Sequence, residues 1–339
     1  MQTKTTHGPQ CLNGYMLEDV PCPLCGEADS STVYSHVHDH YNGLAGDFAV
    51  VRCRSCGFVY TNPRPTEDTI GHFYPDSAGY FSPAAPQDPG PMDILFESYL
   101  ADVLGYPSTG GDRPFLSKVL RPYCALRAKI TGIPPFVSGG RLLDVGCSYG
   151  RYLSKMAAYG WSVYGIEPHA AAAEVAMQVC GAGNVHNGTI ATAPWQDSFF
   201  DVITLNMSLE HCHTPVKVLQ KASALLKNDG VLIVSVPNFA GFESKLHAQF
   251  AYTLHAPCHL SHFTPQTLRM AGEKSGLQCT EIVFHHVDRD FVAPFEYKKN
   301  VYLSKLVHAR LVRKLLIKPA VFIAARMGLT SRMTAYFKK

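Results

Sequence analysis

The second half of the chain alternates short apolar runs with helix-like segments, and this alternation limits the fold more than any other feature of the sequence. Apolar runs of this length, bounded by turn residues, are typical of buried strands. They are RLLDVG (141–146), WSVYGIEP (161–168), FFDVITLNM (199–207), VLIVSVPN (231–238) and LQCTEIVFHHV (277–287). Parallel strands that alternate with helices form a sheet covered on both faces. The sequence therefore predicts an α/β fold with a doubly wound, mostly parallel sheet.

The first of these strands ends in a glycine-rich turn, Asp144-Val145-Gly146-Cys147-Ser148-Tyr149-Gly150. In a doubly wound sheet such a turn presents backbone N–H groups to a ligand at the carboxyl ends of the strands. Arg151 occupies the place of the third glycine of a Gly-x-Gly-x-x-Gly motif, which argues against a dinucleotide site. Glu167 follows about twenty residues later, where a carboxylate can accept hydrogen bonds from both ribose hydroxyls. The alternative is an ordinary tight turn with Glu167 as a surface residue.

Two Cys-x-x-Cys-Gly turns lie near the start of the chain, Cys22 with Cys25 and Cys53 with Cys56. Thiolates spaced in this way can share one tetrahedral Zn²⁺, and four protein ligands leave no open position for substrate. We therefore predict a closed, structural zinc site. A redox role for the two pairs is the main alternative, and the ribbon-like spacing disfavours it.

The chain divides into four segments by composition. We predict a leader over 1–20, a zinc-ribbon module over 21–62, a connector and helical segment over 63–139, and the α/β domain over 140–339. Within the connector, residues 77–92 are rich in Pro, Gly and Ala and are expected to be irregular.

The charge of the chain is unevenly distributed. Beyond Glu296 there are eleven basic and no acidic residues, which leaves 19 basic against 27 acidic residues before it. Within this tail, LSKLVHARLVRKLLIKP (303–319) is predicted to form a basic amphipathic helix with residues 303, 307, 311 and 315 on one stripe. Such a helix suits peripheral contact with a membrane or packing on the body of the protein. The region around the cysteines is not basic, so a nucleic-acid partner is disfavoured there.

No apolar run is long enough to span a membrane, and the first residues lack the apolar core of a secretory signal. We therefore expect a cytoplasmic protein, peripheral to the membrane if the basic helix binds there.

Taken together, LLDVGCSYGRYL, YGIEP and SFFDVITLNMSLEHCHTPVKVLQKASALLKNDGVLIVSVPN resemble the class I S-adenosylmethionine-dependent methyltransferases from about residue 140 to the C-terminus. The resemblance implies a seven-stranded Rossmann-like sheet, with SRMTAYFKK (331–339) as its final strand. It also implies that Glu167 binds the ribose and that the cofactor's remaining contacts come from Asp144, Gly146, Cys147, Gly150, Ile190 and Asn206. The first four would surround the methionine part, and Ile190 would lie at the adenine. Ser148 replaces the glycine usual in the middle of the turn.

Methyl transfer to a hydroxyl needs a group that removes the acceptor's proton. Three histidines follow strands on the side where an acceptor would enter: His211, His259 and His262. Each is a candidate general base, and each is also compatible with a role in orienting its loop. Glu210 is either a hydrogen-bond partner for them or a solvated residue.

The N-terminal CPLCG turn and the Asn-Pro-Arg-Pro connector also resemble small methyltransferases that act on small molecules or glycans. The sequence therefore predicts an S-adenosylmethionine-dependent methyltransferase with structural zinc, acting at oxygen on a small-molecule or glycan or lipid-linked acceptor. The alternatives are a nucleic-acid methyltransferase and a non-catalytic scaffold that keeps the fold.

Overall fold

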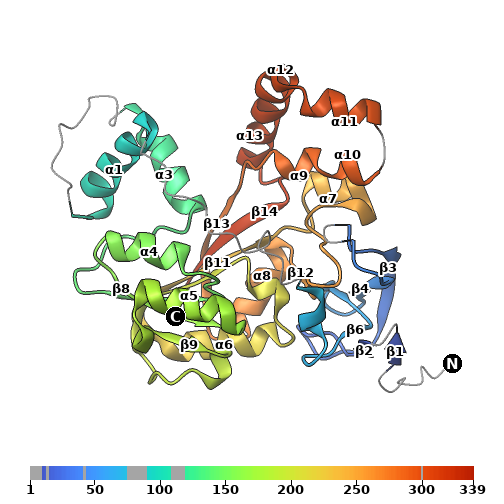
Figure 1. Cartoon of the computed structure of the whole chain (residues 1–339), viewed down its shortest axis with the longest axis horizontal. Helices are drawn as coiled ribbons and strands as arrows, with labels where there is room; N and C mark the ends of the chain where they lie inside the picture. The colour runs from blue at the N-terminus through green and yellow to red at the C-terminus, as the bar shows by residue number, and fades with distance from the viewer. Residues whose placement is uncertain (1–9, 13–14, 41–42, 75–89, 108–118, 299–300) are drawn as a thin grey trace.

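The computed structural model describes residues 10–12, 15–40, 43–74, 90–107, 119–298 and 301–339 (Figure 1). Its centre is a seven-stranded sheet in the order β13-β14-β11-β10-β7-β8-β9. The strands are β7 (Arg141–Val145), β8 (Ser162–Glu167), β9 (Val185–Asn187), β10 (Phe200–Asn206), β11 (Leu226–Pro237), β13 (Gln278–Phe284) and β14 (Arg332–Lys338). Strands β9, β8, β7, β10 and β11 run parallel, and β14 is antiparallel to both of its neighbours. The predicted doubly wound, mostly parallel, Rossmann-like sheet is confirmed.

Helices cover both faces of this sheet. Successive residues of β7 point to opposite faces, so Leu142 packs in one apolar cluster and Leu143 in the other. Six helices flank the sheet. Two of them contribute Leu219 and Leu268 to the cluster of Leu143, and the remaining four contribute side chains to the cluster of Leu142. The first pair is α6 (Pro215–Leu225) and α8 (Pro265–Glu273); the others are α1 (Pro91–Leu104), α3 (Arg121–Ile130), α4 (Arg151–Ala158) and α5 (Ala170–Cys180).

Short 3₁₀ turns and one short strand complete this domain. The turns are η2 (Ala182–Asn184), η3 (Ile190–Thr192), η4 (Leu209–His211) and η5 (Ala248–Phe250), and α7 (Phe242–His247) precedes η5. The strand β9 was not among the apolar runs that the sequence singles out. Its three residues are too few to give a periodic pattern, and it forms because it pairs with β8.

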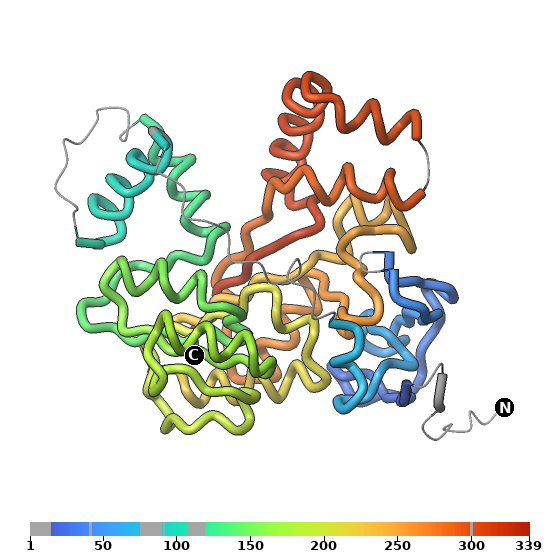
Figure 2. Tube along the Cα trace, viewed as in Figure 1, coloured from blue at the N-terminus to red at the C-terminus, as the bar shows by residue number. Residues whose placement is uncertain are grey.

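The cysteine module is a small sheet that includes a strand from the α/β domain. Its order is β12-β5-β4-β3, with β3 (Ser30–Val37), β4 (Phe48–Cys53), β5 (Val59–Thr61) and β12 (Ser261–His262). Figure 2 shows the N-terminal part of the trace lying beside the segment that leads to β12. The Phe58 and Phe263 rings lie 5.2 Å apart in the same apolar cluster as the central sheet. The module and the domain therefore share both a sheet and a core.

Part of the predicted leader is structured. Tyr15–Glu18 forms β2, which pairs with β1 (Gln10–Leu12) and with β6 (Arg64–Pro65). Arg64 Nε forms an ion pair with Glu18 Oε1 at 2.8 Å and so holds this strand. Local sequence patterns do not reveal such a long-range contact. The connector continues into η1 (Ile70–Phe73). Residues 1–9 of the leader and most of the predicted irregular linker, 77–89, lie outside the described residues.

The basic tail differs from its prediction. It is a helical projection between the adjacent antiparallel strands β13 and β14, formed by α9 (Arg289–Val292), α10 (Pro294–Tyr297), α11 (Val301–His308), α12 (Arg310–Val312), the π-helical turn η6 (Arg313–Ile317) and α13 (Lys318–Arg326) (Figure 1). Ala309 takes an extended ψ of 127° and breaks the expected single helix. Val307 is 8% exposed whereas Leu311 is 70% exposed, so the predicted stripe does not share one face. The final strand, β14, lies where the sequence placed it.

No helix among the described residues is both long enough and apolar enough to cross a bilayer.

Candidate active site

Three polar side chains meet at the carboxyl ends of neighbouring strands. Asp144 lies near the end of β7, Glu167 ends β8 and Asn206 ends β10. Because β7 pairs in parallel with both β8 and β10, the three ends lie at one edge of the sheet. The glycine turn that follows β7 rises beside them.

Asp144 is held as a buried carboxyl. It is 2% exposed, and its Oδ1 accepts hydrogen bonds from Thr204 Oγ1 at 2.6 Å and Asn206 Nδ2 at 3.3 Å. Burial raises the pKa of Asp144 to about 7, although the two hydrogen bonds oppose the shift. A cation bound beside it would favour the ionised form.

Glu167 fixes the glycine turn to the second strand. Its Oε2 accepts a hydrogen bond from Ser148 N at 2.8 Å, and its Oε1 accepts one from His169 N at 2.9 Å. Burial raises the pKa of this carboxyl, and the same two bonds oppose the rise. A carboxylate has about four acceptor positions, so two remain for a ligand's hydroxyls. The predicted ribose role is compatible with this geometry and stays a prediction.

The turn needs glycine where the sequence has it. Gly146 has φ +78°, and a Cβ there would lie 2.8 Å from Cβ of Ser208. Ser148, which replaces a usual glycine, also takes a left-handed φ of 49°. The hydrogen bond from its N–H to Glu167 offsets part of the strain of that conformation. Ser148 therefore takes the left-handed conformation that a glycine would adopt without strain.

Cys147 and Ile190 are two further residues predicted to contact the cofactor, and both side chains are buried. The backbone N–H of Cys147 donates to Ile166 O at 3.0 Å, and its carbonyl accepts from Gly150 N at 3.0 Å. Its side chain is buried in the core against the face of Gly165. Ile190 begins η3, is 4% exposed and packs in the same cluster as Ile166. Their predicted cofactor contacts remain predictions.

Sequence reasoning missed four residues that organise the site. Thr204 bonds Asp144, and Ser208 Oγ donates to Val145 O at 2.7 Å. Gly132, from the helical segment before the domain, lies beside Asn206: a Cβ added to Gly132 would be 3.4 Å from Asn206 Oδ1. Tyr152 Oη donates a hydrogen bond to the carbonyl oxygen of Gly132 at 2.6 Å and so holds Gly132 in place. These contacts join residues far apart in sequence, so no local pattern signals them.

Two of the three candidate histidines lie together, and the third lies apart. The His211 and His259 rings are 4.7 Å apart, and His259 is also 5.0 Å from the His255 ring. His262 lies in β12, where its Nε2 is 3.2 Å from Thr61 Oγ1. His262 pairs with Val59 of β5 in the module's sheet and is 2% exposed. Thr61 Oγ1 also donates to His259 O at 2.9 Å, so His262 and the His259 backbone share this neighbour. The roles of the three histidines toward an acceptor stay predictions.

Burial keeps these histidines neutral. It lowers the pKa of His211 and of His262 to about 3, and it holds the pKa of His259 well below its ordinary value. For His211 the neighbouring His255 adds to the effect. A neutral imidazole has one nitrogen with a free lone pair, but such low pKa values make these rings weak general bases.

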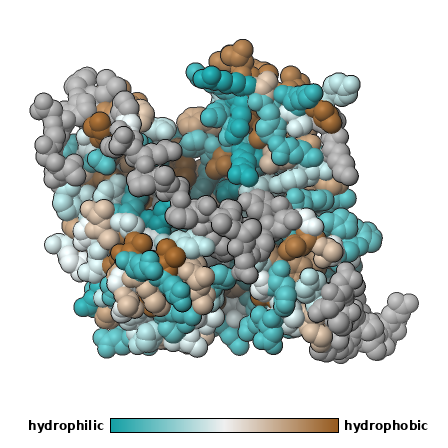
Figure 3. Space-filling model, in the orientation of Figure 1, coloured by the Kyte–Doolittle hydropathy of each residue, from teal (hydrophilic) through white to brown (hydrophobic). Residues whose placement is uncertain are grey.

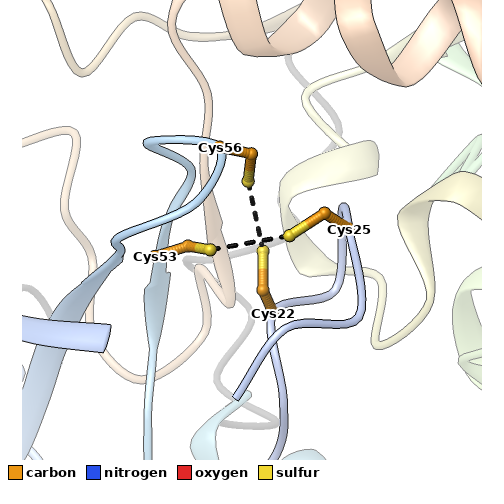
Figure 4. A group of neighbouring side chains, drawn as sticks. All are labelled: Cys22, Cys25, Cys53 and Cys56. Atoms are coloured by element: carbon orange, nitrogen blue, oxygen red, sulfur yellow. Dashed lines mark hydrogen bonds between the residues drawn. The ribbon is translucent and has the colours of Figure 1, made fainter. Parts of the chain in front are cut away.

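The four cysteine sulfurs of the N-terminal module converge, as Figure 4 shows. Cys22 Sγ lies 3.6 Å from Cys56 Sγ, and Cys25 Sγ lies 3.5 Å from Cys53 Sγ. Zinc–sulfur bonds of about 2.3 Å in a tetrahedron place sulfurs about 3.8 Å apart, so the four residues fit a zinc ion. Gly26 (φ +85°) and Gly57 (φ +74°) close the turns with N–H bonds to the carbonyls of Cys22 and Cys53.

Comparison with known proteins agrees with this architecture. A family model described as a methyltransferase domain matches residues 115–282. The ubiquinone biosynthesis O-methyltransferase of Haemophilus ducreyi is 35% identical over 115 residues, which cover 30% of this chain and 46% of that protein. The enzyme of the same name from Actinobacillus pleuropneumoniae is 35% identical over 113 residues, covering 30% and 47%. This chain thus spans about half the length of the curated relatives it matches.

The solved structures to which the chain is similar include an S-adenosylmethionine-dependent methyltransferase from Mesorhizobium loti. It has a TM-score of 0.42 and 14% identity, and the match covers 65% of this chain and 97% of that one. The sheet order, the single antiparallel strand β14 and the matched domain lead to one conclusion. Residues 115–282 match the model of a methyltransferase domain, and the sheet has the Rossmann-like fold of the class I S-adenosylmethionine-dependent methyltransferases.

Proposed function

We propose that the protein is an S-adenosylmethionine-dependent methyltransferase that acts on a hydroxyl of a small molecule. The observation that carries the proposal is the group of Asp144, Glu167 and Asn206 at three adjacent strand ends, beside a turn that Glu167 itself holds in place. The relatives named above are O-methyltransferases, which supports oxygen as the acceptor atom. A glycan or lipid-linked acceptor stays a prediction of the sequence.

Each of these residues has a role toward the cofactor. S-adenosylmethionine, when bound, supplies the methyl group of its sulfonium to the acceptor. Asp144 would pair with the ammonium of the methionine part, and Glu167 would accept hydrogen bonds from the ribose hydroxyls through its remaining positions. Gly146 and Gly150 keep the turn free of side chains, so that the cofactor can approach the backbone. Ile190 would provide apolar contact for the adenine.

We further propose that the four cysteines bind one structural Zn²⁺. Four thiolates at tetrahedral spacing leave no position for a substrate, so the ion would stabilise the module without taking part in methyl transfer.

Cofactor binding should depend on pH through Asp144. The pKa of this carboxyl is about 7, so below pH 7 the proton competes with a cationic ligand for it. We expect the dissociation constant for S-adenosylmethionine, measured by calorimetry on the full chain, to rise about tenfold from pH 8 to pH 6. Asp144→Asn should bind more weakly at pH 8 and lose this pH dependence.

The exposed Asp197 provides a matched control, since Asp197→Asn should keep both the affinity and its pH dependence. A folded full chain that shows no binding of S-adenosylmethionine at millimolar concentration would refute the proposed function. If the cofactor binds but no panel of hydroxylated small molecules gives S-adenosylhomocysteine, the scaffold alternative is favoured. Binding of nucleic acid with steep salt dependence would favour the third alternative.

We also propose that the helical projection (residues 289–326) contacts an anionic membrane surface. Large apolar side chains lie on its outside, each at least 55% exposed: Tyr302, Leu306, Leu311, Leu315, Leu316 and Ile323. Exposed cations lie among them: Lys305, Arg310, Lys314, Lys318 and Arg326. Figure 3 shows brown patches over the upper end of this projection, next to teal ones. Apolar residues interleaved with basic ones suit the interface of an anionic bilayer.

Leu311→Ser with Leu315→Ser should reduce binding to vesicles of anionic phospholipid by at least about tenfold, because burial of two leucines would be lost. Co-sedimentation at low and high salt measures this, and the wild type should bind less at high salt. Val179→Ser, at an exposed position on α5, is the control and should bind like the wild type. Failure of the wild type to bind anionic vesicles at low salt would refute membrane contact.

A further inference from the structure

A cluster outside the predicted cofactor contacts brings together Glu210, His211 and His259. One carboxylate oxygen and two ring nitrogens lie within 4.8 Å of one another. Glu210 and His211 belong to η4, directly after β10, whereas His259 precedes β12. Leu260 N donates to the Glu210 carbonyl at 2.8 Å, and this bond fixes the two segments side by side.

The Glu210 side chain is the observation that points to a ligand. It is fully buried, and neither of its carboxyl oxygens has a hydrogen-bond partner among the described residues. A buried polar group left without a partner costs about 1–3 kcal/mol, and more when it is charged. The nearby guanidinium of Arg332 is already engaged by Asp290, at 2.6 and 2.8 Å. A bound cation would therefore satisfy an acid that the protein itself leaves unsatisfied.

The two histidines are oriented as metal ligands commonly are. His259 Nδ1 lies 2.8 Å from Thr253 O, and His211 Nδ1 lies 3.0 Å from Cys258 O. A carbonyl only accepts, so these contacts place the ring hydrogen on Nδ1 and leave the Nε2 lone pair for an ion. A metal-binding histidine typically donates its other N–H to a carbonyl or carboxylate in this way. Tyr74 Oη, 2.7 Å from His211 Nδ1, is a further neighbour from the connector.

We propose that Glu210, His211 and His259 form a second metal site, which takes a divalent transition ion such as Zn²⁺. Two imidazoles and one carboxylate suit this class of ion better than Mg²⁺, which prefers oxygen ligands. Ligands at about 2.1 Å from a tetrahedral ion lie about 3.4 Å apart. The three ligand atoms lie within 4.8 Å of one another, so each distance would have to shorten by at most about 1.4 Å to close the site.

The site lies close to the cofactor turn. Ser208, two residues before Glu210, bonds the carbonyl of Val145 and faces Gly146. Three protein ligands leave at least one coordination position, which a water or the hydroxyl of an acceptor could fill. The metal site itself does not depend on the proposed methyl transfer.

Elemental analysis of the full chain tests the proposal. Wild type, incubated with excess Zn²⁺ and desalted, should hold one zinc per chain more than Glu210→Gln or His259→Gln. In titrations with Co²⁺, the dissociation constant of this site should rise at least about 100-fold in both variants. His213→Gln is the control, because His213 lies two residues from His211 and bonds Pro65 O instead; it should match the wild type.

Equal zinc contents in the wild type and in a folded Glu210→Gln would overturn the second site. If that variant does not fold, His259→Gln gives the same comparison. In wild type that carries one Zn²⁺ at the four cysteines, added Co²⁺ should absorb without sulfur-to-metal charge transfer, which reports the second site directly. Calorimetry with S-adenosylmethionine on the same samples separates the two proposals. Cofactor binding without the extra ion refutes only the metal site, and the extra ion without cofactor binding refutes only the proposed function.

Discussion

Replacing Glu167 by alanine is expected to raise the dissociation constant for S-adenosylmethionine by about 100-fold or more. Two hydrogen bonds from ribose hydroxyls to a buried carboxylate would be lost, and each contributes about 1.5–3 kcal/mol when one partner is charged. The same change removes the acceptor that holds Ser148 N at 2.8 Å, so the turn also loses its support. Calorimetry on the full chain measures the effect.

Two further variants make this result interpretable. Glu167→Gln keeps one carbonyl oxygen but turns an N–H₂ group toward either Ser148 N or His169 N, so we expect a smaller loss of about tenfold. Glu174→Ala, at an exposed position on α5, should leave the affinity unchanged. An unchanged affinity in Glu167→Ala, with thermal unfolding like that of the wild type, would remove the ribose assignment.

Replacing Cys22 or Cys53 by serine is expected to lower the zinc content by one ion per chain and the Tm by at least about 10 °C. Structural zinc contributes on the order of 10 kcal/mol to the folding of small zinc modules. The effect should reach beyond the module, because Phe58 and Tyr60 share an apolar cluster with Phe263 and Leu268 of the α/β domain. A fraction of the expressed Cys22→Ser protein should therefore be insoluble.

Cys279→Ser is the matched control, since Cys279 is a free cysteine on β13 outside the four-sulfur cluster. Its zinc content and Tm should stay close to those of the wild type. Elemental analysis and thermal unfolding give both readouts. A wild type that takes up no zinc at this cluster, with the Tm of Cys53→Ser unchanged, would contradict a structural zinc site.

Much of the central sheet can be predicted from the sequence. The strands β7, β8, β10, β11 and β13 lie on the apolar runs of the sequence, although β13 buries only Val283. The family resemblance implies the last strand, β14. The three-residue β9 and the two-residue β12 were not anticipated, because their stability comes from pairing with a neighbour rather than from their own composition. The same reason explains why local sequence patterns do not predict the strand Tyr15–Glu18, which pairs with β1 and β6.

The candidate site was predictable only in part. Asp144, Gly146, Gly150 and Glu167 lie on one turn and one strand end, where spacing alone indicates a role. Thr204, Ser208 and Gly132 support them from other segments, and only the tertiary structure reveals those contacts. His259 and His262 are three residues apart in sequence, yet their rings bond different partners. His259 Nδ1 bonds Thr253 O, whereas His262, in β12, bonds Thr61 Oγ1.

The sequence by itself determined the fold class, the cysteine cluster and the glycine turn after β7, because apolar periodicity, ligand spacing and glycine placement are local properties of the chain. The tertiary structure decided what lies beside them. In the tertiary structure the basic tail forms several helices, and the cysteine module joins the α/β domain because β12 pairs with β5. The same packing places His259 next to Glu210 and His211. These arrangements depend on contacts between distant segments, whose geometry is set by the packing of the whole core.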